Sequence, residues 1–414
     1  MRKILFLVNE SHSANGICTK AVMKACVQRG FLVHCITNRE YADGDMYTVD
    51  GVVYHTVKPR WCYRIDSMLM RKQLRPVFVH GLRLLNTCIN KIKLLMTVHT
   101  WPLISKAYAN RIYRCAISVC QEYDIDTIVP IYTQIDTLIA AERIKREKNQ
   151  IRYIPYFLDA LSGGYGPKVF SQDWTIRRGR KWEDKLLGSA DRIIMMQSCR
   201  EHCEKHLSDA VYFHRIRFVD LPLFTPALDV VEQVQHDERI RLLYVGSIPQ
   251  HIRDPEYFLR LFHQIEIPNL ELIIVGTSTC PALLQRAAEQ DERIHILPPV
   301  SHSEAMSMMR SADIFLNLGN NNPRMTPSKI FEYMSFGKPI ISTAPIADEP
   351  SLRYLERYPC SLVINQLQAV SEHVIKVQNF ILENKCSKID TSTLVNQFYF
   401  NTPDAFVACI CDEE

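Results

Sequence analysis

Short, β-branched-rich apolar runs alternate along the chain with longer segments of helical periodicity. In the first half these runs are KILFLV, FLVHCIT, DTIVPIY, YIPYFL and RIIMMQ. In the second half they are IRLLYVG, LELIIVG, RIHILPPV, DIFLNLG, KPIIST and SLVI. Short apolar strands separated by helices are typical of parallel sheets whose strands are joined by crossover helices. The pattern therefore predicts an α/β fold in both halves.

A polar stretch with two prolines, LPLFTPALDVVEQVQHDE, separates the two halves and is typical of a linker. The 414 residues also exceed what one ordinary hydrophobic core holds. We expect a first domain at 1–222, a second at 223–385 and a tail at 386–414 that packs back on the first. Two doubly wound domains that face each other place a cleft between the carboxyl ends of their sheets, where such folds bind ligands.

Composition indicates a folded protein, because 47% of the residues are hydrophobic and 23% are charged. No apolar run approaches the roughly 20 residues that a membrane-spanning helix needs. The first apolar run stops at Val8, so a buried strand explains it better than a signal peptide does. The 14 cysteines are scattered through apolar segments, as in proteins of a reducing compartment. We therefore expect a cytoplasmic protein.

One group of cysteines and histidines has a spacing that a metal site could use. Cys199, His202, Cys203 and His206 recur on one face of a helix. Structural zinc sites usually take ligands from more than one element, so a core-facing helical stripe is the favoured interpretation. We expect no bound metal ion and no other cofactor.

The most informative segment is TPSKIFEYMSFGKPII, which begins at Thr326. Thr326 suits the N-cap of a helix, and Pro327 suits its first position. The free backbone N–H groups of such a helix start, with the Ser328 hydroxyl and the Lys329 cation, form a cradle for a diphosphate. Glu332 lies on the same helical face and can accept hydrogen bonds from both hydroxyls of a ribose. An ordinary capped helix with a surface Lys–Glu pair is the alternative.

From Leu242 onward the chain resembles the family 4 glycosyltransferases of the GT-B fold, also described as glycosyl transferases group 1. The resemblance is carried by LLYVGSI, LELIIVGTS, RIHILPPVSHSEAMSMMRSADIFLNLG and PSKIFEYMSFGKPII, in the expected order and spacing. The first half is similar more loosely, through the opening strand, the Gly16 loop and SADRIIMMQS. The resemblance implies two Rossmann-like domains facing across a cleft. It also implies transfer of a sugar from a nucleotide diphosphate donor to a glycan or polyprenyl-linked acceptor, with retention, in the synthesis of cell-surface polysaccharides or glycoconjugates.

The resemblance also implies roles for individual residues. Glu332 would bind the ribose, and Lys329 and Arg253 would stabilise the departing diphosphate. On the acceptor side, His12 is the candidate catalytic group, and Gly16 and Asp159 lie where the acceptor would bind. The remaining donor-binding candidates lie in the loops after the strands of the second half and at the start of the helix, namely Gly246, Ser247, Gly276, Thr277, Pro299, Val300, Ser301 and Ser328.

Two other functions stay open. A nucleotide-sugar 2-epimerase also uses two domains of this kind. A catalytically degenerate partner protein is the second alternative, because Arg324 stands where the family often has a glutamate. The strand IVPIYTQ likewise lacks the histidine with which it often ends.

Between residues 56 and 115 basic residues greatly outnumber acidic ones, of which Asp66 is the only example. Aromatic and aliphatic residues such as Trp61, Met68 and Trp101 are interleaved with them. Cationic amphipathic segments of this kind suit an anionic membrane surface, whereas a solvated basic face is the alternative. We expect no nucleic-acid partner, because no recognised binding module accompanies the charge.

Overall fold

The computed structural model divides the chain into two compact units. Unit 1 combines Met1–Pro222 with Phe400–Glu414, and unit 2 is Leu223–Tyr399. The segment 386–399, expected to belong to a tail on the first domain, is part of unit 2. There Ile389 donates its N–H to the carbonyl of Gly337 at 2.7 Å. The structure describes residues 1–9, 14–39, 44–60, 81–82, 85, 87–89, 92, 98–103, 105–164, 166–167, 170–226, 238–323 and 325–411.

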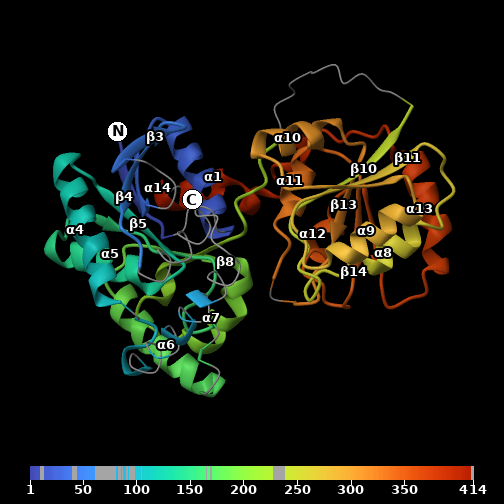
Figure 1. Ribbon diagram of the computed structural model, residues 1–414. Coiled ribbons are helices and arrows are strands. Elements are labelled where there is room, and N and C mark those ends of the chain that lie inside the picture. The colour runs from blue at the N-terminus through green and yellow to red at the C-terminus, as the bar shows by residue number, and fades with distance from the viewer. Residues whose placement is uncertain are drawn as a thin grey trace. The chain divides into compact units, whose positions relative to one another are not determined.

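Unit 1 is built on one sheet, in which the described residues form nine strands in the order β3-β4-β2-β1-β5-β7-β8-β9, with β6 beside β5 (Figure 1). Only β3 runs antiparallel to its neighbour among these strands. The order reverses between β1 and β5, which pair in parallel, so this is the point where a doubly wound sheet binds ligands. The strands are β1 Lys3–Leu7, β2 Leu32–Asn38, β3 Met46–Val49, β4 Val52–Val57, β5 Thr127–Tyr132, β6 Arg152–Tyr153, β7 Tyr156–Phe157, β8 Ile193–Met196 and β9 Ile216–Val219.

The helices of unit 1 include one from the end of the described chain. This helix, α14, packs against α1, which Figure 1 shows in red and blue respectively. Three arginines hold the last carbonyls of α14: Arg2 and Arg152 donate to Ile410, and Arg192 donates to Cys409. The helices are α1 Ala14–Gln28, α4 Lys106–Glu122, α5 Ile135–Glu147, α6 Gln172–Leu187, α7 Arg200–His206 and α14 Pro403–Cys411.

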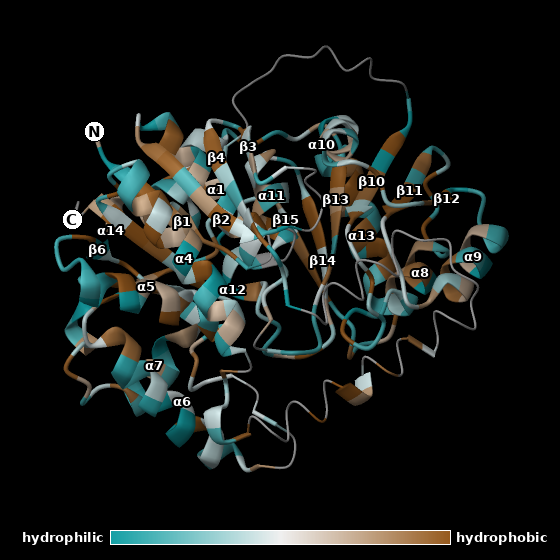
Figure 2. Ribbon diagram, turned by 60° about the vertical axis from the view of Figure 1, so that its left-hand side comes forward, coloured by the Kyte–Doolittle hydropathy of each residue, from teal (hydrophilic) through white to brown (hydrophobic). Residues whose placement is uncertain are grey.

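Unit 2 contains a six-stranded parallel sheet in the order β12-β11-β10-β13-β14-β15. The strands are largely buried, and Figure 2 shows them brown while the outer helices carry hydrophilic residues. The strands are β10 Ile240–Val245, β11 Leu270–Val275, β12 Ile294–Leu297, β13 Ile314–Leu318, β14 Ile340–Ala344 and β15 Ser361–Asn365. The helices are α8 Glu256–Phe262, α9 Pro281–Gln290, α10 His302–Ser311, α11 Lys329–Ser335, α12 Leu352–Leu355 and α13 Ser371–Asn384.

Alternation along the central strand β13 shows how the sheet of unit 2 is covered on both faces. Ile314 and Leu316 belong to the core cluster that includes residues of α8, α9 and α13. Phe315 points to the other face, where its ring stacks on Tyr333 of α11 with centroids 4.4 Å apart. Helices on both faces of a parallel sheet are what the sequence pattern predicts. No helix in the described parts of the chain is both long enough and apolar enough to cross a membrane.

A buried histidine pair makes the stability of unit 1 depend on pH. His34 Nδ1 lies 3.0 Å from His55 Nε2, and the ring of Tyr123 lies 4.2 Å from that of His34. Burial and, to a smaller extent, the neighbouring His55 together lower the pKa of His34 to about 4, although Glu122 acts in the opposite direction. Burial also lowers the pKa of His55. The folded state therefore disfavours protonation of both rings.

We expect unit 1 to lose about 1–2 kcal/mol of stability between pH 7.5 and pH 5 through His34. The unfolded chain takes up a proton near the ordinary histidine pKa of about 6.5, whereas the folded chain does so only near pH 4. The sequence places all four tryptophans within unit 1, so their fluorescence during urea unfolding reports on this unit. The variant His34→Gln/His55→Gln should lose part of the pH dependence. An equal loss of stability in wild type and variant would contradict this role.

Candidate active site

The candidate site in unit 2 lies at the carboxyl ends of β10 and β13. These strands are neighbours, with Leu242 opposite Ile314. The order of the sheet reverses here, because β11 and β12 continue on one side and β14 and β15 on the other. Loops that leave neighbouring parallel strands in opposite directions form a crevice at the carboxyl edge. Residues far apart in sequence therefore meet at this edge.

Two glycines allow the ends of β10 and β11 to approach closely. Gly246 has a φ of +153° and Gly276 a φ of +140°. A Cβ atom on Gly276 would lie 2.0 Å from the carbonyl oxygen of Gly246, so no other residue fits. The next residues are both exposed, and Thr277 Oγ1 donates to Ser247 Oγ at 3.1 Å. The edge thus presents two adjacent hydroxyl groups beside a tight backbone turn.

Arg253 joins the ends of β10 and β13. Its Nε donates to Asn320 Oδ1 at 2.6 Å, and its Nη1 donates to the carbonyl of Ser247 at 3.3 Å. Asn320 is fully buried, which fixes the direction of the guanidinium group. Among the described residues no carboxylate forms an ion pair with Arg253. Its hydrogen bonds are to neutral groups, and Glu349 acts on it only at a distance, so its charge stays available for an anion.

Asn320 and Glu349 support Arg253 from behind, and the sequence analysis did not identify either. Glu349 is 2% exposed and accepts the N–H of Asn320 at 3.1 Å and that of Ser351 at 2.8 Å. Burial raises the pKa of Glu349, although these hydrogen bonds act in the opposite direction. The asparagines that directly follow β13 were the available signal, because polar residues at the end of a buried strand often belong to a site.

Helix α11 begins two residues later than the sequence suggested. Its N-cap is Ser328 rather than Thr326, and Lys329 rather than Pro327 is its first residue. The preceding loop is held by a hydrogen bond from Asn320 Nδ2 to the carbonyl of Met325, which replaces the expected helical turn. The Ser328 side chain makes no capping hydrogen bond. Its hydroxyl is therefore not used to start the helix.

Lys329 and Glu332 lie on one face of α11, as the spacing predicts, and they bind each other. Lys329 Nζ and Glu332 Oε2 are 2.7 Å apart, and both side chains are partly exposed. The next residue fixes the helix on the sheet, because the hydroxyl of Tyr333 accepts the N–H of Val245, the last residue of β10, at 2.9 Å. The pair is thereby tied to the strand end that precedes Gly246.

The third loop of the edge follows β12. Pro299 and Ser301 are exposed, and Val300 is half-buried. Ser301 is the N-cap of α10, where its side chain and that of Glu304 form a capping box. Ser301 therefore stabilises the start of α10, a role that was not predicted from the sequence. Because β12 pairs with β11, the segment Pro299–Ser301 lies beside the loop that follows β11.

Comparison with known proteins identifies unit 2. Residues 239–353 match the family described as glycosyl transferases group 1. The chain is a glycosyltransferase. No curated protein matches it in sequence.

Solved structures show that this glycosyltransferase has the GT-B fold. A sucrose-phosphate synthase from Thermosynechococcus elongatus is 13% identical, with a TM-score of 0.60 over 100% of this chain and 98% of that one. Anabaena Alr3699/HepE in complex with UDP-glucose is 12% identical, with a TM-score of 0.52 over 100% and 97%. An Escherichia coli protein bound with UDP-2-fluoro glucose is 9% identical, with a TM-score of 0.59 over 99% and 98%. At this identity the likeness concerns the fold.

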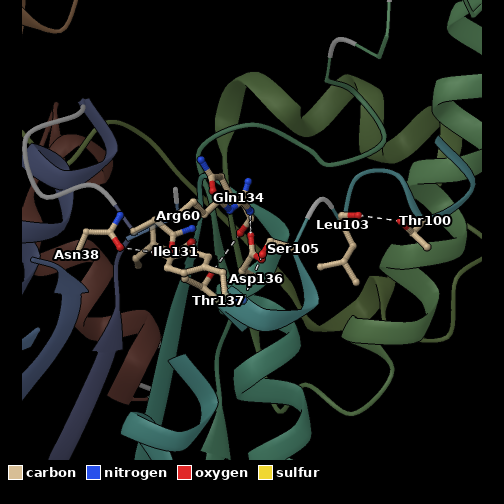
Figure 3. A network of polar contacts seen from close by, with 11 residues as sticks. Asn38, Arg60, Thr100, Leu103, Ser105, Ile131, Gln134, Asp136 and Thr137 are labelled. Atoms are coloured by element: carbon tan, nitrogen blue, oxygen red, sulfur yellow. Dashed lines mark hydrogen bonds and ion pairs between the residues drawn. The ribbon is translucent and has the colours of Figure 1, made fainter. Parts of the chain in front are cut away.

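In unit 1 of the glycosyltransferase, buried polar residues gather at the carboxyl edge of the sheet. Figure 3 shows Arg60, which follows β4, beside Asp136 in the first turn of α5, and the two form a buried ion pair. Tyr108 donates to Asn9 Oδ1 at 3.0 Å and also contacts Asn38 Oδ1. Asn9 lies just after β1, and Asn38 is the last residue of β2. These polar groups therefore surround the switch point of this sheet. None of these residues was among the predicted site residues, because the signal was spread over four distant segments.

Several atoms of this cluster retain unused hydrogen-bonding capacity within the described part of the chain. They are Asn9 Nδ2, Arg60 Nε and Asp136 Oδ1, and each belongs to a side chain that is at least nine-tenths buried. Buried polar atoms normally have partners, because an unmade hydrogen bond costs about 1–3 kcal/mol. Neutral and paired polar groups at a switch point suit a ligand with many hydroxyl groups.

Two of the residues predicted for the acceptor side, Gly16 and Asp159, lie within the described part of unit 1. Gly16 lies in the first turn of α1 rather than in a loop, and the neighbouring Asn15 donates to the carbonyl of Tyr132 at 3.4 Å. Asp159 follows β7 and reaches solvent, yet the surrounding protein still raises the pKa of its carboxyl group by burial. His12 lies outside the described residues, as does Arg324.

The cysteine and histidine stripe serves packing. Cys199 Sγ approaches the carbonyl of Leu158 at 3.7 Å, and Cys203 Sγ approaches Met195 Sδ at 3.3 Å. His202 Nε2 lies 2.8 Å from Ser162 Oγ. Among the described residues no three potential ligands gather around one point as a metal site would require.

Most basic residues of the segment 56–115 lie outside the described residues. Of those described, Lys58, Lys106 and Arg114 are exposed. Arg60 is buried, and Arg111 donates to the carbonyls of Lys58 and Pro59. Arg60 therefore belongs neither to a membrane-facing nor to a solvated basic face, because Asp136 balances its charge inside unit 1.

Proposed function

We propose that this glycosyltransferase moves a sugar from a nucleotide diphosphate donor, bound at the carboxyl edge of unit 2, to a hydroxyl-bearing acceptor bound at the carboxyl edge of unit 1. The observation that carries the donor assignment is Arg253, a cation oriented by neutral groups at the switch point of the sheet. A diphosphate is the anion that such a guanidinium binds well, because two of its N–H groups match two phosphate oxygens.

The donor would occupy the edge from β12 to α11. The backbone N–H of Ser247 and the hydroxyl of Thr277 would contact the phosphates, while the N–H of Gly246 donates to the carbonyl of Val275 and fixes the turn between them. The loop Pro299–Ser301 would flank the base, and Glu332 would accept the hydroxyls of the ribose. In the free protein Lys329 is paired with Glu332, one helical turn away. When the donor binds, the ammonium group of Lys329 would turn to contact the diphosphate. The ion pair thus keeps both groups at the site in the free protein.

Transfer needs little acid–base chemistry from the donor side. As the bond between the anomeric carbon and the diphosphate breaks, negative charge grows on the leaving oxygen. Arg253 and Lys329 stabilise that charge, and this raises the rate because the stabilisation is greatest in the transition state. The acceptor hydroxyl attacks the same face in a reaction with retention, and its proton passes to the departing oxygen or to Asp159. His12 is the second candidate for this proton.

The acceptor proposal rests on the edge of unit 1. The pair Arg60–Asp136 and the amides of Asn9 and Asn38 offer donors and acceptors that suit sugar hydroxyls. A glycan or a polyprenyl-linked sugar in the synthesis of cell-surface polysaccharide fits this chemistry. The reaction would then take place in the cytoplasm at the inner face of the membrane, in agreement with the free thiols of the described cysteines.

A binding screen with UDP-, GDP- and ADP-sugars tests the proposed donor site by calorimetry. We expect one nucleotide class to bind, and Arg253→Ala to weaken that binding. Incubation of the bound nucleotide sugar without acceptor then separates transfer from epimerisation, because a transferase gives at most slow hydrolysis whereas an epimerase converts the sugar. If none of these nucleotides bound, the donor assignment would be wrong.

The ribose contact leads to a prediction for Glu332. We expect Glu332→Ala to weaken nucleotide binding by about 2–3 kcal/mol, since hydrogen bonds to a charged group are lost. Glu332→Gln, which keeps one carbonyl acceptor, should lose less. Calorimetric titration with the preferred nucleoside diphosphate provides the measurement, and an unfolding curve identical to that of wild type provides the control. Unchanged affinity in both variants would remove Glu332 from the site.

A further inference from the structure

Helix α6 has a clearly defined inner face. Ser171 caps its start by accepting the N–H of Trp174 at 3.2 Å. Thr175, Gly179 and Glu183 are buried, and a Cβ atom on Gly179 would lie 2.5 Å from the Cα of Ser162. Because these residues follow each other at intervals of four, they mark the side of α6 that packs on unit 1.

The opposite side of α6 carries exposed cations. Lys181 and Lys185 lie seven and eleven residues after Trp174, which places all three on one side of the helix, with Arg177 beside them. Arg177, Lys181 and Lys185 are exposed. In the described part of the chain no carboxylate forms an ion pair with any of these three side chains. Their positive charge is therefore not balanced within unit 1 by direct contact.

The neighbouring basic residues of α6 have partners within unit 1. Arg180 donates to Asp209 at 2.5 Å and to the carbonyl of His206 at 2.8 Å. Arg178 donates to the carbonyl of Trp101 at 3.1 Å. These two arginines fix the helix. Of the three outer cations, Lys185 lies over the ring of Trp182 at 5.1 Å from its centroid, and all three remain exposed for contact with another surface.

Aromatic side chains lie on the same outer side, which an ordinary solvated helix does not require. The ring of Trp174 stacks on Phe170 with centroids 4.3 Å apart and lies 5.4 Å from the ring of Trp101. Phe170 is 37% exposed, and Trp101 and Trp174 are partly exposed. The three rings thus form a cluster outside the core of unit 1. Trp182 extends it, because its Nε1 donates to the carbonyl of Trp101 at 3.0 Å.

We propose that this outer face of α6, formed by Trp174, Arg177, Lys181 and Lys185 with Trp101 and Phe170 beside them, docks on an anionic lipid bilayer. The charges are complementary to acidic headgroups, and each basic residue near such a surface contributes about 1 kcal/mol. Tryptophan is enriched at the membrane interface, where its ring is shielded from water while its N–H stays hydrated. A neutral partner would not match the three outward cations. A purely anionic partner would not need the three partly exposed rings beside them.

The docking surface lies on α6 of unit 1, whereas the donor site lies in unit 2. An experiment that disproves one of these two assignments therefore leaves the other untouched. The docking proposal rests on the proposed function only where it names the acceptor, since a docked unit 1 would reach a sugar that is attached to a membrane lipid. Nucleotide binding by unit 2 tests the donor site, and vesicle binding tests α6.

Sedimentation with vesicles provides the test. Wild type should sediment with vesicles of phosphatidylcholine and phosphatidylglycerol and stay in solution with pure phosphatidylcholine. High salt should release it, since the attraction acts over a Debye length of about 8 Å at physiological ionic strength. The variant Arg177→Glu/Lys181→Glu/Lys185→Glu should bind the anionic vesicles at least about tenfold more weakly. Trp174→Ala should lower binding while the net charge stays the same.

A matched variant controls for overall charge. Unit 2 offers three exposed basic residues for this control: Arg286 on α9, Lys376 on α13 and Lys385 at the end of α13. Changing them to glutamate alters the net charge by the same amount as the triple change on α6. This control should bind anionic vesicles like wild type. The triple glutamine variant of the α6 cations replaces the glutamate variant if the latter unfolds. Equal losses in the control and the α6 variants, or wild-type binding that does not distinguish the two kinds of vesicle, would overturn the proposal.

Discussion

Replacing Arg253 with alanine should lower kcat by about two to three orders of magnitude, which is the effect of removing one preorganised donor to a developing negative charge. The guanidinium is held by Asn320 Oδ1 and by the carbonyl of Ser247, so it needs no rearrangement when charge appears on the diphosphate. KM should change much less, because the interaction strengthens as the glycosidic bond breaks. The release of nucleoside diphosphate under saturating donor gives kcat directly.

Two further variants sharpen this test. Arg253→Lys retains the charge but not the fork geometry, so we expect only partial recovery. Arg286→Ala removes an exposed arginine of α9 in the same unit and should leave kcat unchanged. Wild-type turnover in Arg253→Ala would show that Arg253 supports the loop structure and does not contact the leaving group.

Replacing Lys329 with alanine should lower kcat by roughly two orders of magnitude or more. In the free protein the lysine neutralises Glu332 at 2.7 Å. Its removal takes a positive charge from the diphosphate site and leaves the carboxylate uncompensated, and both effects oppose departure of an anion. Steady-state kinetics at saturating donor measure the loss.

The comparison of Lys329→Ala with Lys329→Ala/Glu332→Gln separates these two effects. If repulsion by Glu332 contributes, the double variant should recover part of the turnover of the single variant. Lys376→Ala, on the exposed surface of α13, serves as the matched lysine control. Normal kcat with a raised KM in Lys329→Ala would mean that the lysine binds the ground state and the transition state equally.

The alternation of apolar runs and helices predicted the strand sequence of unit 2, including the two strands that end at Gly246 and Gly276. Both features follow from local rules, since buried strands are apolar and a close approach of two strand ends requires glycine. The start of α11 did not follow, because a hydrogen bond from Asn320 to Met325 holds the residues that would otherwise form its first turn. Local capping rules do not include a contact of that kind.

The candidate sites show the same limit. Lys329 and Glu332 could be found because their spacing along one helix brings them together. The support of Arg253 by Asn320, and of Asn320 by Glu349, joins the ends of strands that only the order of the sheet makes neighbours. Likewise Arg60 and Asp136 lie far apart in the sequence, so their ion pair depends on a topology that no single segment encodes.

The hydrogen bonds from three arginines to the last carbonyls of α14 affect the order in which the two units are completed on the ribosome. Arg2, Arg152 and Arg192 belong to segments that leave the ribosome before unit 2, whereas the carbonyls they bind are synthesised after it. Unit 2 is continuous, so its sheet can be completed during synthesis. Unit 1 has to wait for Pro403–Cys411 before α1 is covered and these three guanidinium groups reach their partners. The domain that begins first is thus completed last, and during that interval its nascent surface is the one that chaperones would encounter.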